Sequence, residues 1–120
     1  MSVLDLDEIN NDYNEELTSD KYMIIRNRII NNSSDKPFVV RYKNNIVGYY
    51  HIAFLDNFDS VANVFIKRKK ENIHLFDDYT FEKFRGIGVH GFSVYSRMMI
   101  GLKYNNKTAT VNILDGNLFS

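Results

Sequence analysis

The sequence contains no cysteine, so neither a disulfide framework nor thiolate chemistry is open to the chain. Lys and Arg together number 15, as do Asp and Glu, and a net charge of +0 gives no global field that attracts nucleic acid or an acidic membrane. No apolar run approaches the roughly 18 residues that span a bilayer. Met1-Ser2-Val3, followed by acidic residues, lacks the basic and apolar regions of a secretory signal. These absences predict a cytoplasmic protein that binds neither nucleic acid nor membrane.

The length and the apolar pattern predict one domain that begins with helices. At 120 residues, 44% of them hydrophobic, the chain supports a single domain with a modest core, which we place at residues 1–120. After an acidic opening, Thr18 to Asp20 offer N-cap oxygens to a helix. The apolar residues from Tyr22 to Ile30 recur at spacings of three and four, as on one helical face.

Two β-rich runs follow the helix. They extend from Phe38 to Lys43 and from Ile46 to Phe54, and Asn44-Asn45 joins them. Because Asn tolerates the positive φ of a tight turn, the pattern predicts an antiparallel hairpin. Asn57-Phe58-Asp59-Ser60 then breaks the second strand, and Val61 to Lys67 is typical of a further strand or a long arm.

The next stretch predicts two more strands and contains a basic cluster. The cluster, Lys67-Arg68-Lys69-Lys70, either contacts phosphate or forms a solvated turn. Ile73 to Phe81 alternates incompletely, which is typical of a central strand buried on both faces. Thr108 to Leu114 is β-branched enough for a last strand.

Three glycines within six residues lie between the central strand and a helix that begins near Val89. They are Gly86, Gly88 and Gly91. Without a Cβ, glycine lets the backbone come close to a ligand and allows positive φ. A helix start also presents N–H groups that lack intrahelical partners. The stretch therefore predicts an anion-binding turn.

The helix after this turn carries one apolar stripe. We predict that the stripe packs into the core, with polar residues on the other faces. Its members are Val89, Phe92, Tyr95, Met99 and Leu102.

Two motifs carry a resemblance to the GCN5-related N-acetyltransferases, or GNAT superfamily. Arg85 to His90, preceded by a strand and by the aromatic Phe84, resembles the acyl-coenzyme A signature Q/R-x-x-G-x-G/A of that family. Asn117-Leu118-Phe119-Ser120 resembles the N-x-x-S that opens a later helix, and one helix plus one strand separates the two motifs, as in the family. The resemblance implies an α+β fold. Its mixed, mostly antiparallel sheet has N-terminal helices and a helix between two parallel central strands.

The resemblance also implies a coenzyme A site made mainly of backbone. Acetyl-coenzyme A would be the co-substrate, with no metal. Its pyrophosphate would lie on the N–H groups of Gly86 to Gly91, and its pantetheine arm would pair with main-chain groups of one strand. The implied cofactor-binding residues are Asp78, Tyr79, Thr80, Arg85, Gly86, Ile87, Gly88, Val89, His90, Gly91 and Asn117.

Compared with the family pattern, this sequence differs at three places. His90 stands where the pattern has a small residue, and Asn112 stands where relatives often have a carboxylate base. A C-terminal helix with its Tyr proton donor and the last two strands would be missing after Ser120, which makes the predicted domain incomplete. We therefore expect a homodimer or a partner chain that completes the sheet.

Several of these residues have a structural interpretation as well. Asp77 and Asp78 include a candidate general base, because a carboxylate in a cleft can have a raised pKa. Alternatively, they are solvated charges at a strand end or partners of a helix dipole. His51 and His74 are expected to be structural, whereas His90 at a helix start is placed to bind phosphate when protonated. The literal G-x-G-x-x-G of Gly86 to Gly91 does not indicate a dinucleotide fold, because an antiparallel hairpin precedes it.

Two functions remain open. The first is acyl-coenzyme A-dependent N-acetylation of a small amine or sugar-like acceptor by direct attack, with Asp77 and Asp78 as candidate catalytic residues. The second is a non-catalytic, GNAT-like binding or interaction module that needs a partner chain.

Overall fold

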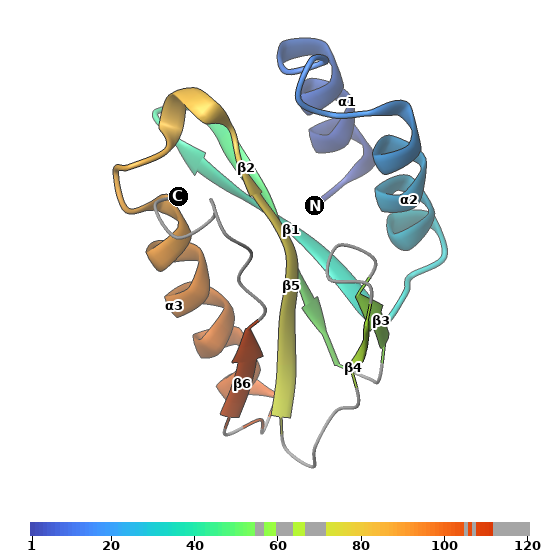
Figure 1. Ribbon diagram of the computed structural model, residues 1–120, viewed down its shortest axis with the longest axis vertical. Coiled ribbons are helices and arrows are strands. Elements are labelled where there is room, and N and C mark those ends of the chain that lie inside the picture. The colour runs from blue at the N-terminus through green and yellow to red at the C-terminus, as the bar shows by residue number, and fades with distance from the viewer. Residues whose placement is uncertain (55–56, 60–63, 67–71, 105, 107, 112–120) are drawn as a thin grey trace.

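The computed structural model describes residues 1–54, 57–59, 64–66, 72–104, 106 and 108–111 (Figure 1). Its elements follow one another as α1 (Val3–Asp12), α2 (Ser19–Ile30), β1 (Asp35–Tyr42), β2 (Asn45–Ala53), β3 (Asn57–Asp59), β4 (Val64–Ile66), β5 (Asn72–Thr80), a short 3-10 helix (Glu82–Phe84), α3 (Val89–Lys103) and β6 (Thr108–Val111).

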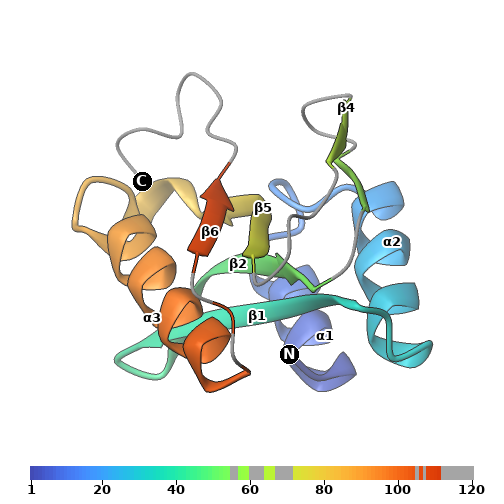
Figure 2. The same cartoon turned by 90° about the horizontal axis from the view of Figure 1, so that it is seen from below.

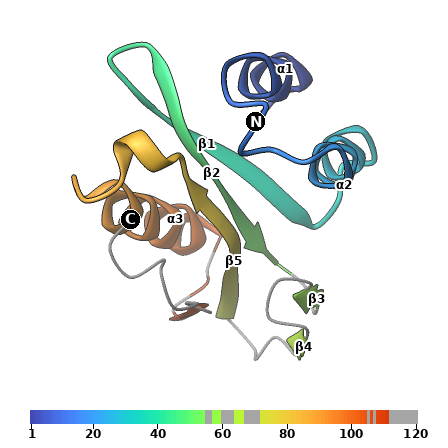
Figure 3. The same ribbon diagram turned by 45° about the horizontal axis from the view of Figure 1, so that its top comes forward.

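The main sheet has the strand order β1-β2-β5-β6. β1 and β2 are antiparallel, as are β2 and β5, whereas β5 and β6 are parallel and are joined through α3. The helices α1 and α2 lie on one face of the sheet and α3 on the other (Figure 3). The predicted α+β class, the mostly antiparallel sheet and the helix between two parallel strands are confirmed.

The hairpin between β1 and β2 turns one residue earlier than predicted. Lys43 and Asn44 have φ values of 50° and 68°, and Asn45 pairs with Tyr42 in the ladder. Two central residues with positive φ give the turn whose twist matches that of the flanking strands. The prediction was therefore right to within one residue: Lys43 and Asn44 form the turn, instead of Asn44 and Asn45.

The segment after β2 differs from the prediction. Asn57–Asp59, expected only as a break, forms β3 and pairs antiparallel with β4 at Val64–Ile66. Of the predicted strand over 61–67, only Val64–Ile66 lies within the described residues, and it forms β4. The basic cluster at 67–70 lies outside the described residues.

The core under α1 and α2 is apolar and aromatic. Ser2 caps α1 in a capping box with Asp5, and Thr18 caps α2 as predicted. Tyr13 stacks on Phe81 with ring centroids 3.9 Å apart. The buried members of this cluster are Leu6, Ile9, Leu17, Ile25, Ile46, Tyr49 and Phe81.

The predicted core stripe of α3 is wrong except at Val89, which is buried. Phe92, Tyr95, Met99 and Leu102 are 59%, 64%, 49% and 53% exposed. The other buried residues of α3 are Ser93, Arg97 and Gly101, which follow Val89 at spacings of four. A buried ion pair of Arg97, described below, fixes this orientation of the helix. Gly101 allows the close approach, since a Cβ there would lie 2.7 Å from a side-chain carbon of Ile73.

Gly48→Ala is expected to destabilise the fold by about 1–3 kcal/mol, the usual cost of overpacking. A Cβ at Gly48 would overlap the hydroxyl of Tyr50 and lie 2.6 Å from the backbone oxygen of Tyr79. Urea unfolding measures the change. Gly91→Ala is the matched control, because a Cβ there meets nothing within 4 Å and alanine favours a helix. Equal stability of the two variants would contradict the expected clash.

Candidate functional site

A β-bulge in β5 separates two consecutive carboxylates. Tyr49 pairs with Tyr79 and His51 pairs with Phe76, so Asp77 and Asp78 together oppose Tyr50 alone. Asp77 has a φ of 49°, in the left-handed region. The extra residue directs the Asp77 side chain toward α2 and the Asp78 side chain toward α3, as their hydrogen bonds show.

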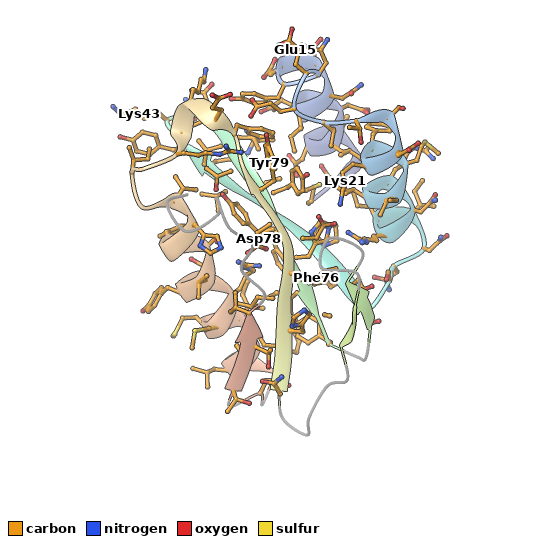
Figure 4. The ribbon with its side chains drawn as sticks, in the orientation of Figure 1. Glu15, Lys21, Lys43, Phe76, Asp78 and Tyr79 are labelled. Carbon is orange, nitrogen blue, oxygen red and sulfur yellow. The ribbon has the colours of Figure 1, made fainter. Side chains whose placement is uncertain are left out.

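The Asp77 carboxylate forms ion pairs with two cationic side chains of α2. Lys21 Nζ lies 2.7 Å from one carboxylate oxygen and an Arg28 guanidinium nitrogen 2.8 Å from the other. Figure 4 shows Lys21 extending from α2 toward the sheet. Burial by itself raises the pKa of Asp77, but the neighbouring cations outweigh it and hold the pKa below its usual value.

His51 completes this cluster as a neutral ring. Arg28 donates to its Nε2 at 2.9 Å, so Nδ1 carries the proton and donates to the backbone oxygen of Asp77 at 3.0 Å. Burial lowers the pKa of His51 to about 4. The prediction that His51 and His74 are structural residues is supported, because both are buried within the sheet and His74 stacks on Phe76.

Asp78 is held on the other face by α3. Two guanidinium nitrogens of Arg97 lie 2.7 and 2.8 Å from its two oxygens, and His90 Nε2 lies 3.1 Å from one of them. Arg97 also donates to the backbone oxygens of His51 and Ser93. Its side chain is 2% exposed. Burial raises the pKa of Asp78, but the hydrogen bonds from His90 and Arg97 outweigh it and lower the pKa.

Neither carboxylate has the electrostatics that the sequence suggested for a base. A raised pKa was considered for Asp77 and Asp78, and both pKa values are lowered instead. The solvated alternative is also wrong, because both side chains are buried in ion pairs. Arg97, the partner of Asp78, was not predicted from the sequence. A single charged residue four positions after Ser93, within an otherwise apolar stretch of helix, was the available signal.

Acid is expected to destabilise the fold in two stages. Between about pH 6.5, the ordinary pKa of histidine, and the pKa of about 4 that His51 has when folded, the unfolded chain binds a proton that the folded chain does not, so the free energy of unfolding decreases as the pH falls. Below that range the lowered pKa values of Asp77 and Asp78 act in the same direction. Asp35, whose pKa burial raises, opposes them.

Urea unfolding at a series of pH values between about 4 and 7 measures this slope. In the variant His51→Gln the side chain at this position does not titrate. We therefore expect a flatter dependence of the free energy of unfolding on pH, above the pH range in which the carboxylates titrate. A slope in the variant as steep as that of the parent chain would assign the effect to other groups.

The glycine turn has the open geometry predicted for an anion site. Gly86 and Gly88 have φ values of 81° and 85°, and Gly88 is the N-cap of α3. A Cβ at either position would meet nothing within 4 Å. The first backbone hydrogen bond of α3 is donated by Phe92 N–H to Gly88 C=O. Within the described chain, the N–H groups of Val89 to Gly91 make no hydrogen bond, as expected for a first helical turn.

Next to this turn, the outer edge of β5 has no strand partner among the residues that the structure describes. Phe81 N–H donates to Val47 C=O, so by the alternation of an antiparallel ladder the backbone groups of Thr80 point away from β2. The side chain of Arg85 already donates to Thr80 C=O at 2.9 Å. β6 pairs with β5 only as far as Leu75 in the part of the chain that is described.

Most of the predicted cofactor-binding residues therefore lie in one continuous segment of the chain, in which Thr80 and Val89 are buried. From Asp78 to Gly91 they run along the open part of β5 and around the turn into α3. The guanidinium of Arg85 lies 5.0 Å from the ring centroid of Tyr79, whose hydroxyl donates to Glu16. His90 faces Asp78. Asn117, the remaining predicted contact, lies outside the described residues.

Solved structures of acetyltransferases share the fold of this chain. A ribosomal-protein-alanine N-acetyltransferase from Brucella melitensis superposes with a TM-score of 0.66 at 13% identity, over 97% of this chain and 78% of that one. AAC(6')-Iy in complex with a CoA bisubstrate analogue gives a TM-score of 0.69 at 11% identity, over 98% and 78%. A GNAT family acetyltransferase from Staphylococcus aureus gives 0.61 at 16%, over 98% and 84%.

The chain has the GNAT fold. No protein-family model matches the sequence, and no curated protein matches it either. The backbone thus shows the GNAT fold, although the sequence identity to these structures is low and the sequence alone offers only two short motifs. Within this fold the glycine turn and the bulge of β5 border the same segment, residues 77–91.

Two further features are absent from the described residues. No helix there is both long and apolar enough to cross a bilayer. No three His, Asp or Glu side chains come together there as a group that could hold a metal ion.

Proposed function

We propose that the chain is an acyl-coenzyme A-dependent N-acetyltransferase that transfers an acetyl group to the amine of a small molecule or sugar-like acceptor. The observation that carries this proposal is the open glycine turn at the start of α3, adjacent to an edge of β5 that the described residues leave unpaired beyond Leu75, on a GNAT fold. Similar structures include AAC(6')-Iy in complex with CoA and a predicted acetyltransferase from Clostridium acetobutylicum with acetyl-CoA.

The residues present fit coenzyme A. Because Gly86, Gly88 and Gly91 leave open space where a Cβ would stand, the backbone of the turn is accessible to a pyrophosphate. The free N–H groups of the first turn of α3 and the helix dipole favour a negative charge there. Main-chain groups of Asp78 to Thr80 would hold the pantetheine arm as an added strand. Acetyl-coenzyme A would supply the thioester that the acceptor amine attacks.

In this proposal Asp77 and Asp78 act through their ion pairs. Lys21 and Arg28 fix one carboxylate and Arg97 fixes the other, so the bulge between β2 and β5 is held from both faces. Fixed backbone N–H groups stabilise a developing oxyanion without reorganisation during the reaction. Proton acceptance by either carboxylate stays a prediction, and the lowered pKa values argue against it.

The exposed surface of α3 favours the second candidate function, a non-catalytic module that binds a partner chain. Phe92, Tyr95, Met98, Met99 and Leu102 form an exposed apolar face along α3. Such a face is often covered by protein. The homodimer or partner chain, the single domain and the cytoplasmic location all stay predictions.

Calorimetric titration with acetyl-coenzyme A tests the proposed function. We expect one saturable site per chain and release of free coenzyme A thiol when an amine acceptor is added. Binding without turnover across a panel of amines would favour the non-catalytic module. Absence of binding to a chain that is folded by circular dichroism would contradict both the cofactor site and the enzyme.

A further inference from the structure

A pocket of about 850 Å³ lies at the opposite end of α3 from the glycine turn. It is formed by the start of β1, the end of α2, the end of β2 and the last turn of α3, and we call it the β1-edge pocket. Its lining includes Arg28, Lys36, Phe38, Phe54, Lys103 and Tyr104. In Figure 2 the last turn of α3 and the helix α2 lie on opposite sides of the middle of β1. The 15 residues of α3 separate this pocket from the turn by roughly 20 Å.

The described residues that line the pocket carry positive charge and no carboxylate. Lys36 Nζ donates to the neutral amide oxygen of Asn32 at 2.6 Å, so its charge has no anionic partner there. Lys103 is exposed at the rim. Arg28 differs, because Asp77 already neutralises it. In a chain whose total charge is +0, this pocket is locally cationic.

Aromatic side chains form much of the wall. Phe54 and Tyr104 meet edge to face, with ring centroids 5.8 Å apart, and Phe38 lies on the β1 side. The volume falls in the range of small-molecule sites, which combine apolar walls with a few polar groups. Two lysines beside aromatic rings complement a ligand with one anionic head and a flat apolar body.

The edge of β1 at this pocket is closed to an added strand. Pro37 has no N–H, and its C=O accepts from the amino group of Met1 at 3.1 Å. The N–H of Asp35 already donates to Ser33 Oγ at 3.0 Å. A peptide that extended the sheet would find few backbone partners here, so the side-chain walls determine the ligand.

We propose that the β1-edge pocket binds a small aromatic carboxylate, with the carboxylate at Lys36 and Lys103 and the ring against Phe38, Phe54 and Tyr104. This site is separate from the coenzyme A site and does not depend on the acetyltransferase proposal.

Titration with naphthalene-2-carboxylate, compared with the neutral 2-naphthamide, tests the proposal on the full chain. We expect saturable binding of the acid, at least about tenfold tighter than that of the amide, because a charge-assisted contact is lost in the amide. Lys36→Gln and Lys103→Gln should each weaken binding of the acid toward that of the amide. Lys43→Gln, which removes a lysine at the distant hairpin turn, is the matched control and should change nothing.

Acetyl-coenzyme A titrations of the same variants separate the two sites. Unchanged coenzyme binding in Lys36→Gln and Lys103→Gln, together with weakened binding of the acid, supports a separate pocket. No saturable binding of the acid, equal affinity for acid and amide, or an equal effect of Lys43→Gln would each overturn the proposal. The three outcomes that would overturn the proposal do not depend on whether the glycine turn binds coenzyme A.

Discussion

Arg97→Met should lower the free energy of unfolding by about 3–5 kcal/mol, as is typical when one partner of a buried ion pair is removed. The substitution keeps an unbranched side chain of similar reach. Among the described residues, it leaves the buried Asp78 carboxylate with only His90 as a side-chain partner. It also removes the donor to the backbone oxygen of His51. Urea unfolding followed by circular dichroism measures the change.

A double-mutant cycle separates the pair from general packing. Asp78→Leu combined with Arg97→Met replaces both charges with apolar groups and should cost clearly less than the sum of the two single changes. Arg41→Met is a control on the surface, where Arg41 pairs with Asp5 and Glu8 at 44% side-chain exposure, and its effect should be small. Additive costs for Asp78 and Arg97 would show that the ion pair contributes little.

Gly88→Trp should weaken binding of acetyl-coenzyme A at least about 100-fold. Gly88 is exposed at the N-cap of α3, and an indole there would fill the open space over the first-turn N–H groups. Losing two charge-assisted hydrogen bonds of about 1.5 kcal/mol each accounts for two factors of ten. Calorimetric titration measures the affinity.

The comparison must account for backbone strain, because Gly88 has a φ of 85° and any side chain there costs about 1 kcal/mol or more. Gly88→Ala carries the same strain without the bulk. It should bind the coenzyme more tightly than Gly88→Trp while unfolding at a similar urea concentration. Equal affinities of the two variants would mean that the turn does not contact the ligand.

The sequence by itself determined the features that depend on local patterns. Alternating β-rich runs around an Asn pair gave the hairpin, and glycine spacing after a strand gave the turn that opens α3. The start of α3 at Val89 was predicted because these signals are written in neighbouring residues. The mixed sheet with one parallel crossover was an expectation from the resemblance to the GNAT superfamily, which two short motifs carried.

Tertiary structure alone decided which face of α3 is buried. Periodicity identified Phe92, Tyr95, Met99 and Leu102 as the core stripe, yet these residues are exposed. The four-residue spacing of Ser93, Arg97 and Gly101 was equally regular, but its burial depended on Asp78, which is distant in sequence.

The chemistry of Asp77 and Asp78 was decided in the same way. One extra residue in β5 places the two carboxylates on opposite faces, where cations from α2 and α3 hold each of them ionised. A bulge depends on the pairing of two strands, and a pKa depends on charges brought close in space. Local sequence records neither, so these properties appeared only once the helices were packed on the sheet.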